Sequence, residues 1–213
     1  MGYYPLFLEM KGRRCLVVGG GQVAARKVEG LLAAGASVNV VSSELDPGID
    51  RLKAERRIQH TARQYQSGDL KGYTVVIAAT DDAATNERVA LDARRSGVFV
   101  NVVDQPALCD FIVPSVIRRG DVVLAISTGG LSPALARWLR QELETYVSED
   151  FERLAQLLAD VRVELRERFV TVAAEAWQRS IDARLLELIA DGRFDEARAR
   201  LLASLGAGAQ LKA

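Results

Sequence analysis

The sequence contains few of the residues from which disulfide frameworks and metal centres are built. Its 213 residues include one histidine and two cysteines. Two cysteines do not make a disulfide framework, and no spacing of Cys, His and Asp indicates a fixed metal site. We expect Cys15 and Cys109 to be buried thiols and His60 to be structural or exposed. This cysteine usage suits the reducing cytoplasm, so a cytoplasmic location is expected.

An excess of one charge and a long apolar run are missing as well. Lys plus Arg and Asp plus Glu both number 28, so the net charge is zero and nucleic acid is not an expected partner. The longest apolar stretches, such as 122–126, are too short to cross a bilayer. Residues 1–11 do not have the basic start and apolar core of a signal peptide. We therefore expect no membrane partner, and a local cluster of basic side chains must hold any anionic substrate.

A strand, a glycine turn and a helix follow one another directly near the start of the chain. The apolar residues 15–18 run into Gly19, Gly20 and Gly21, and an amphipathic helix pattern begins at once. Gly19, Gly21 and Ala24 match the G-x-G-x-x-G/A pattern of dinucleotide-binding proteins. In that pattern the helix N-terminus, with its free N–H groups, faces a pyrophosphate. The turn therefore predicts a bound dinucleotide, although a purely structural turn would carry the same glycines.

Strand and helix patterns alternate as far as residue 103. Strands are expected at 15–18, 37–41, 57–61, 73–80 and 98–103, with a helix over 81–96 that ends at Gly97. Apolar strands that alternate with helices are typical of a parallel sheet covered on both faces and joined by right-handed crossovers. The fold class is therefore predicted to be α/β, with a Rossmann-type domain over residues 1–113.

A different pattern follows this domain. Two strands, 111–118 and 121–127, are expected around Arg119-Gly120, and Ser132-Pro133 is typical of a helix start. These elements form a linking segment over 114–147. Nearly all of 148–213 has helical periodicity, which predicts a helical module, and 207–213 are expected to be a frayed tail.

Polar residues follow two of the predicted strands at the edge where ligands bind in such sheets. Ser43 and Glu44 come after the second strand, where a carboxylate can accept hydrogen bonds from the adenosine ribose. No arginine adjoins them to bind a 2′-phosphate, which favours NAD over NADP. Both residues would also fit a helix N-terminus. In the segment 78–82, small residues around Thr80 leave room for a ribose or nicotinamide, while Asp81 or Asp82 can serve as a helix cap.

Asp104 is the candidate catalytic carboxylate. It follows the strand at 98–103 and so emerges at the same sheet edge, where a nicotinamide would lie. A carboxylate beside an apolar cleft can act as a general base. Spacing alone fits a simple turn aspartate at the end of a strand equally well.

Basic side chains and a second glycine turn are candidates for holding substrate carboxylates. Bidentate contacts make arginine suited to this task, and each arginine alone would also fit a solvated surface. The candidates are Arg118, Arg119, Arg137 and Arg140, together with the turn at 128–130.

Together these segments resemble the precorrin-2 dehydrogenase/sirohydrochlorin ferrochelatase family, the N-terminal module of siroheme synthase. The resemblance rests on six short motifs spread in order over residues 4–140. They are 4–7 (Tyr-Pro-Leu-Phe), 18–27 (Val-Gly-Gly-Gly-Gln-Val-Ala-Ala-Arg-Lys), 78–82 (Ala-Ala-Thr-Asp-Asp) with Asn86, 101–104 (Asn-Val-Val-Asp), 111–115 (Phe-Ile-Val-Pro-Ser) and 127–133 (Ser-Thr-Gly-Gly-Leu-Ser-Pro).

The resemblance implies NAD-dependent oxidation of precorrin-2 to sirohydrochlorin in siroheme biosynthesis. It assigns the essential aspartate of the family to Asp104 and cofactor contacts to Gln22, Val23, Ser43 and Glu44. Some members also insert Fe²⁺ into sirohydrochlorin with the same aspartate, and others do not. Members form intertwined homodimers, which implies that 114–147 are a dimerisation segment.

Two departures and one alternative accompany this resemblance. The chain has no room for the uroporphyrinogen methyltransferase domain of fused siroheme synthases, so methylation is expected from another protein. Thr128 stands where those enzymes tend to have serine, which puts any role of that serine in doubt. The alternative function is a non-catalytic NAD-sensing regulatory module, which has no need of the motifs at 101–104 and 129–133.

Overall fold

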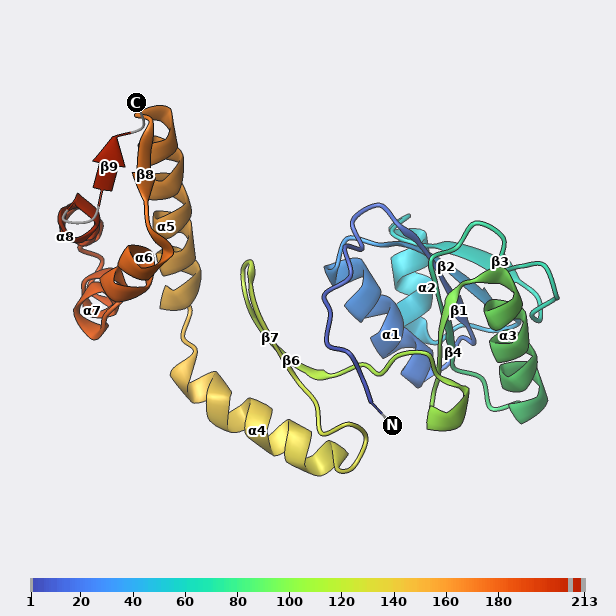
Figure 1. Cartoon of the computed structure of the whole chain (residues 1–213). Coiled ribbons are helices and arrows are strands. Elements are labelled where there is room, and N and C mark those ends of the chain that lie inside the picture. The colour runs from blue at the N-terminus through green and yellow to red at the C-terminus, as the bar shows by residue number, and fades with distance from the viewer. Residues whose placement is uncertain (1, 207–208, 212–213) are drawn as a thin grey trace. The chain divides into compact units, whose positions relative to one another are not determined.

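A computed structural model describes residues 2–206 and 209–211 of the chain, which divides into two units, Met1–Val113 and Pro114–Ala213 (Figure 1). Within the described residues, no helix has the length and apolar character needed to span a membrane.

Five parallel strands form the sheet of the first unit. They are β1 (Arg14–Val18), β2 (Ser37–Ser42), β3 (Gln59–Ala62), β4 (Val75–Ala78) and β5 (Phe99–Val102), arranged in the order β3-β2-β1-β4-β5. This order confirms the predicted α/β, Rossmann-type fold. From β1 the chain adds β2 and β3 on one side and then β4 and β5 on the other, so the strand order switches beside β1. The third strand begins two residues later than expected. Strands β4 and β5 are shorter than the predicted runs 73–80 and 98–103, because the last residues of these runs lie in the loops at the sheet edge.

Helices cover both faces of this sheet (Figure 1). Helix α1 (Gln22–Ala33) and helix α2 (Pro47–Ala54) share one core with the side chains that alternate strand residues send to that face. Helix α3 (Ala83–Ser96) packs on the opposite face, against residues such as Leu16 and Val100. Helix α3 ends at Gly97, whose φ of 66° suits glycine, as predicted.

Helix α2 was not among the predicted elements, and it corrects one alternative. The helix begins at Pro47, and the Asp46 carboxylate caps it by accepting a hydrogen bond of 2.8 Å from the N–H of Gly48. Ser43 and Glu44 therefore lie in the preceding loop, and the interpretation of these two residues as a helix N-terminus is wrong. An aspartate before a proline is a common helix start, so the signal was present in the sequence.

The second unit begins with a hairpin and a helix. Strands β6 (Ser115–Arg119) and β7 (Val122–Ile126) pair antiparallel around Gly120, and helix α4 (Pro133–Tyr146) is capped by the Ser132 hydroxyl as predicted. The first strand of this pair starts four residues later than expected, because Phe111 packs against the core of the first unit instead.

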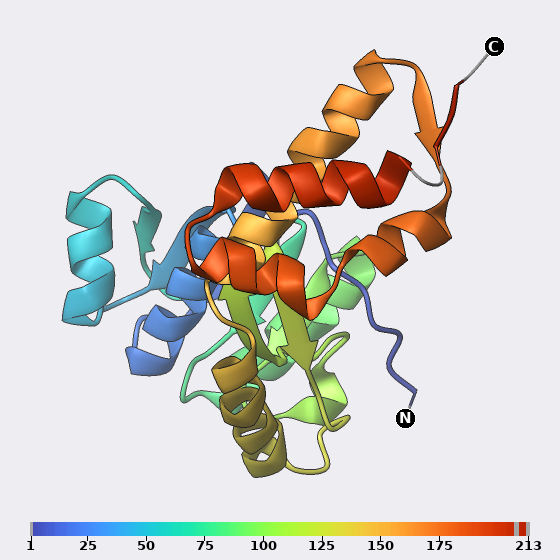
Figure 2. The same cartoon turned by 90° about the vertical axis from the view of Figure 1, so that its left-hand side faces the viewer.

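Four helices and a short strand pair complete the second unit. They are α5 (Asp150–Glu167), β8 (Val170–Val172), α6 (Ala174–Ser180), α7 (Ala183–Ala190), α8 (Phe194–Gly206) and β9 (Ala209–Leu211). Figure 2 shows α8 lying beside α7, and the two share a core with α5. The prediction of a frayed tail is wrong for Ala209–Leu211, which pair antiparallel with β8. Residues 207, 208, 212 and 213 of that tail lie outside the described residues.

Candidate functional site

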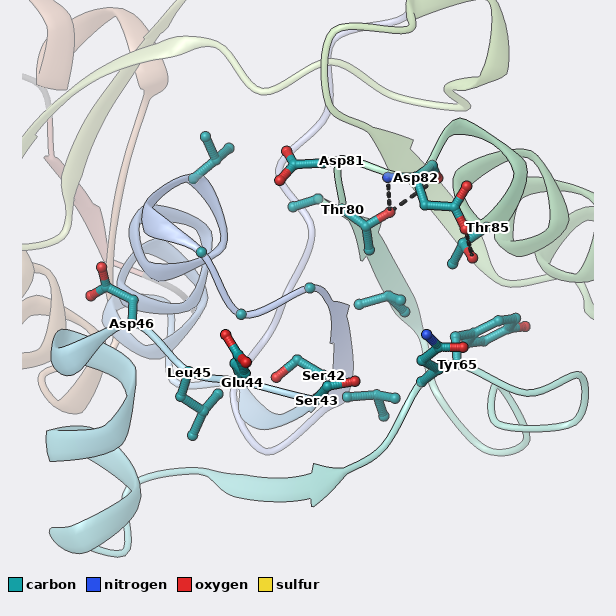
Figure 3. A pocket seen from close by; sticks show the side chains of 18 of the residues that line it. Ser42, Ser43, Glu44, Leu45, Asp46, Tyr65, Thr80, Asp81, Asp82 and Thr85 are labelled. Carbon is teal, nitrogen blue, oxygen red and sulfur yellow. Dashed lines mark hydrogen bonds between the residues drawn. The ribbon is translucent and has the colours of Figure 1, made fainter.

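A cavity of about 610 Å³ opens at the carboxyl ends of β1, β2 and β4. Figure 3 shows Ser43 and Glu44 on one side of it, Thr80 and Asp81 on the opposite side, and Tyr65 toward one end. Eight of the nine predicted site residues line this cavity. They are Gly19, Gly20, Gly21, Gln22, Val23, Ser43, Glu44 and Thr80.

Two of the three glycines are required by the packing of the protein's own backbone. Gly19 has a φ of 116°, and a Cβ added to it would lie 2.2 Å from the carbonyl oxygen of Ala79. A Cβ on Gly20 would lie 1.9 Å from the carbonyl oxygen of Glu44. Glycine at both positions therefore lets the turn after β1 press against the loops after β4 and β2.

Gly21 differs from its neighbours, because packing within the chain does not require it. A Cβ at this position would meet no atom of the described chain within 4 Å, and the φ of −82° is open to any residue. Gly21 is the N-cap of α1 and has no side chain to cap the helix. The N–H groups of Gln22 and Val23 begin this helix at the cavity, so the open space fits the close approach of a pyrophosphate.

The end of β2 is held by the single histidine. The Nε2 atom of His60, on β3, lies 3.0 Å from the carbonyl oxygen of Ser42 and 3.3 Å from its hydroxyl oxygen. These contacts confirm the structural role expected for His60. They fix the strand end from which Ser43 and Glu44, both exposed, reach the cavity.

Asn86 holds the loop after β4. Its side chain is 4% exposed, accepts a hydrogen bond of 2.8 Å from the Thr80 hydroxyl and donates one of 2.9 Å to the Thr80 carbonyl oxygen. Asp82 caps α3 by accepting a hydrogen bond of 3.1 Å from the N–H of Ala84, so capping is the role of this aspartate. Asp81 is exposed and lines the cavity (Figure 3).

Tyr65 is a cavity residue that the sequence did not reveal. It follows β3, is 4% exposed, and donates a hydrogen bond of 3.0 Å from its hydroxyl to the Asp92 carboxylate. Burial and this carboxylate both raise the pKa of Tyr65 above its ordinary value. The phenol therefore stays neutral, and its ring forms a fixed wall of the cavity. An aromatic residue just after a strand was the only sequence signal for it.

Asp104 lies after β5, at the predicted edge of the sheet, but outside the described residues that line the cavity. Its backbone has a φ of 58°, a left-handed conformation that aspartate adopts more readily than most residues. The side chain is exposed, so the apolar surroundings expected for it are not formed within its own unit.

The loop that carries Asp104 is anchored by two side chains. The Asn101 amide donates a hydrogen bond of 2.9 Å to the carbonyl oxygen of Phe111, and the Cys109 sulfur accepts one of 3.1 Å from the N–H of Val102. Burial raises the pKa of the Cys109 thiol, and burial raises the pKa of Cys15 to about 11. Cys15 is therefore the buried thiol expected from the sequence, whereas Cys109 is only partly buried.

The remaining anion-binding candidates lie in the second unit. Arg119 donates a hydrogen bond of 3.0 Å to the carbonyl oxygen of Val147 and lies 3.1 Å from the Glu149 carboxylate, while Arg140 pairs with Glu144. These two arginines therefore serve the packing of their own unit. Arg118 and Arg137 are exposed.

The second glycine turn is closed by its own hydrogen bonds. The Thr128 hydroxyl accepts a bond of 3.0 Å from the N–H of Ser132 and donates one of 3.0 Å to the Ser132 carbonyl oxygen. Gly129 and Gly130 have φ values of 64° and 88°. A threonine hydroxyl thus closes this turn. In the part of the chain that the structure describes, no three His, Cys, Asp or Glu side chains gather as a metal site.

The strand order and the glycine turn after β1 define a Rossmann-type dinucleotide-binding protein. Residues 6–115 match a protein family described as putative NAD(P)-binding, and residues 119–146 match one described as sirohaem biosynthesis protein central. Because the first match covers more than half of the chain, the chain belongs to this NAD(P)-binding family, and the second match lies in the part of the chain that follows the Rossmann-type domain. The first of these matches also confirms the prediction of a nicotinamide dinucleotide cofactor.

Similar proteins include siroheme synthases of two bacteria. The chain is 42% identical over 212 residues to that of Methylococcus capsulatus, covering 99% of this chain and 45% of the relative. It is 43% identical over 196 residues to that of Methylobacillus flagellatus, covering 91% and 42%. The chain thus spans less than half the length of these relatives. A solved structure of SirC, a precorrin-2 dehydrogenase, matches with a TM-score of 0.67 and 27% identity, over 96% of this chain and 98% of that one.

Proposed function

We propose that this chain oxidises precorrin-2 to sirohydrochlorin with NAD⁺. The observation that carries the proposal is the glycine-turn cavity, in which Gly21 leaves space that the chain's own packing does not use. The similarity to a precorrin-2 dehydrogenase over nearly the whole length of both chains supports the choice of reaction. The siroheme synthase relatives support siroheme biosynthesis as the pathway that uses the product, sirohydrochlorin.

The cavity residues fit NAD. The start of α1 would hold the pyrophosphate through the N–H groups of Gln22 and Val23, and Glu44 would accept hydrogen bonds from the adenosine ribose. Among the described residues that line the cavity there is no lysine or arginine, whereas Glu44, Asp46 and Asp81 all lie there. A 2′-phosphate would meet these carboxylates, which favours NAD over NADP. When bound, NAD⁺ would serve as the hydride acceptor.

Asp104 is the proposed general base. Oxidation of a C–C bond in the substrate removes one hydride and one proton, and the Asp104 carboxylate accepts the proton. The hydrogen bonds of Asn101 and Cys109 hold the backbone around this residue, so the carboxylate is presented from a fixed loop. An exposed base requires the substrate itself to exclude water from the reacting carbon.

A homodimer is part of this proposal. We place the dimerisation segment at 114–147 and a separate helical domain at 148–213. The dimerisation segment exposes large apolar side chains on a hairpin and a helix, which is typical of a surface that a partner covers. They are Val116, Leu131, Leu135, Trp138, Leu143 and Tyr146. Light scattering should give twice the chain mass, and a Trp138→Glu variant should give the mass of a single chain. We also propose that the protein is cytoplasmic.

Anaerobic incubation of the chain with precorrin-2 and NAD⁺ tests the reaction. Equal amounts of NADH and sirohydrochlorin are expected, and an Asp104→Ala variant should lose turnover while binding NAD with unchanged affinity. NAD binding without any oxidation of precorrin-2 would instead support a sensing module. Addition of Fe²⁺ to the sirohydrochlorin formed, with and without the chain, tests the ferrochelatase activity that the family resemblance leaves open.

A further inference from the structure

The second unit contains a cavity of its own, lined by residues of α5, β8 and α6 (Figure 1). The cavity has a volume of about 500 Å³ and shares no residue with the glycine-turn cavity. Leu165, Val172 and Trp177 line it and also pack against the core of the second unit, so part of its wall is fixed by that core. We call it the α5–β8 cavity.

Two arginines give the α5–β8 cavity a positive charge. Arg162 and Arg166 lie one turn apart on α5 and both line the cavity, whereas no Asp or Glu is among the described residues that line it. In the part of the chain that the structure describes, neither guanidinium forms an ion pair, although Arg153 on the same helix pairs with Asp150. Like charges four positions apart destabilise a helix, and an anion in the cavity would relieve this repulsion.

The ring of Trp177 supports one of the two guanidinium groups. The Cζ atom of Arg162 lies over this ring, 5.4 Å from its centroid. A guanidinium that stacks on an aromatic ring keeps its N–H donors in its own plane, where a carboxylate can accept from them. Trp177 is half-buried and packs against the core, so Arg162 rests on a fixed support.

Phe169 lines the same cavity in a conformation that its own packing does not explain. It follows the end of α5 with a φ of 58°, a left-handed conformation that suits glycine and is strained for a bulky side chain. The residue is 71% exposed, so burial offers little compensation for the strain. Residues held in such conformations cluster at ligand sites. A flat ring bound in the cavity would provide the apolar contact for Phe169.

We propose that the α5–β8 cavity binds one edge of a carboxylate-bearing tetrapyrrole. The guanidinium groups of Arg162 and Arg166 pair with its carboxylates, and the Phe169 ring packs against its conjugated macrocycle. Arg119 and Arg140, two of the arginines expected to hold substrate carboxylates, are instead engaged within their own unit. The choice of a tetrapyrrole rests on the proposed function, whereas the need for a flat ring with anionic groups follows from the cavity itself.

The indole N–H signal of Trp177 provides a local test of this site. The chain has two tryptophans, so a Trp138→Phe variant assigns both indole signals in an N–H correlation NMR spectrum. Sirohydrochlorin, added under anaerobic conditions, should shift the Trp177 signal until it saturates. NAD⁺, which joins aromatic rings to a pyrophosphate, should leave this signal in place. A Trp177 signal that moves with NAD⁺ and not with sirohydrochlorin would overturn the proposal.

Two arginine variants test the charge. Arg162→Gln combined with Arg166→Gln should weaken the binding of sirohydrochlorin, measured at the Trp177 signal, at least about tenfold. Arg179→Gln is the matched control, because Arg179 is an exposed cation on α6 that does not line the cavity. It should bind with wild-type affinity. Wild-type affinity in the double variant would overturn the proposal.

Phe169→Gly should separate binding from folding. Glycine adopts a φ of 58° without strain, so Tm should rise by about 2–4 °C, while sirohydrochlorin should bind several-fold more weakly because the ring contact is lost. A variant that is less stable and binds normally would make Phe169 a packing residue and overturn the proposal. A wild-type chain without dehydrogenase activity would overturn the proposed function, and the titration with sirohydrochlorin would still decide on the cavity.

Discussion

Asn86 makes two side-chain hydrogen bonds to Thr80: it accepts one from the Thr80 hydroxyl and donates one to the Thr80 carbonyl oxygen. The two residues lie six positions apart, on either side of the start of α3. A buried amide on the helix thus fixes the backbone conformation of the loop after β4. Thr80 lines the cavity, so Asn86 shapes the site without lining it.

We predict that Asn86→Ala weakens both the fold and the cofactor site. Loss of two buried hydrogen bonds should destabilise the chain by about 1–3 kcal/mol and leave the Thr80 carbonyl without its partner. The dissociation constant for NAD, measured by calorimetry, should rise roughly tenfold, or about 1.4 kcal/mol. Thr80→Ser keeps the hydroxyl and both bonds, so it should bind NAD as the wild type does. Equal affinities in Asn86→Ala and wild type would contradict this role.

The glycines of the turn should separate folding from binding. In Gly20→Ala the new methyl group collides with the Glu44 carbonyl, so unfolding in urea should show a loss of about 1–3 kcal/mol or more. In Gly21→Ala the methyl group enters open space, and the cost should stay below about 1 kcal/mol, that of alanine at a helix N-cap.

The same two variants should rank the other way in NAD affinity: of the folded proteins, Gly21→Ala should bind NAD more weakly than Gly20→Ala. Gly21→Ala should raise the dissociation constant at least about tenfold, because the methyl group takes the space proposed for the pyrophosphate. A Gly21→Ala variant that binds NAD normally would show that the cofactor does not approach the turn there.

Cofactor preference should depend on the charge at the end of β2. Glu44→Arg replaces a carboxylate in the cavity with a cation and should shift the ratio of NADP to NAD affinity upward by at least about tenfold. Glu44→Gln removes the charge without adding a cation, and should weaken NAD binding with a smaller gain for NADP. Calorimetric titration of both cofactors provides the ratio. A ratio that does not change in Glu44→Arg would locate the ribose elsewhere.

The elements that the sequence predicted well are those encoded by neighbouring residues. Gly19 to Gly21 and Ser132-Pro133 each specify a turn or cap within a few positions, and the apolar run into Gly19 marks β1 without any knowledge of its partners. The parallel direction of the strands then followed from the alternation of strands and helices, whereas their order in the sheet was not predicted. The cavity residues were predictable because the carboxyl ends of parallel strands meet at one edge.

The parts that were missed depend on contacts between distant segments. Strand β8 pairs with a strand some 40 positions later along the chain, and nothing in either short run specifies that partner. Tyr65 reaches the cavity because its hydroxyl bonds to Asp92 on α3, a contact that no local pattern encodes. The exposure of Asp104 likewise reflects how its loop packs, which its position at a strand end does not determine.

A partly buried ion pair in the loop after β3 provides a test of stability against pH. The Asp69 carboxylate accepts hydrogen bonds of 2.8 and 2.7 Å from the Arg63 guanidinium and one of 2.9 Å from the N–H of Gln66. These bonds hold the pKa of Asp69 below its ordinary value. A depressed pKa means that the stabilisation is complete above the unfolded value of about 4 and is lost as the pH falls through the folded value.

Asp69→Asn should therefore be less stable than wild type at pH 7 by about 1 kcal/mol, a figure reduced because Arg63 is 38% exposed. Urea unfolding at pH 7 and pH 5 should give the same difference, and the difference should shrink below about pH 4, where the wild-type carboxylate takes up a proton. Arg51→Gln breaks an exposed pair with Glu55 and should cost less than about 0.5 kcal/mol. A difference between Asp69→Asn and wild type that grows toward low pH would contradict the sign of this linkage.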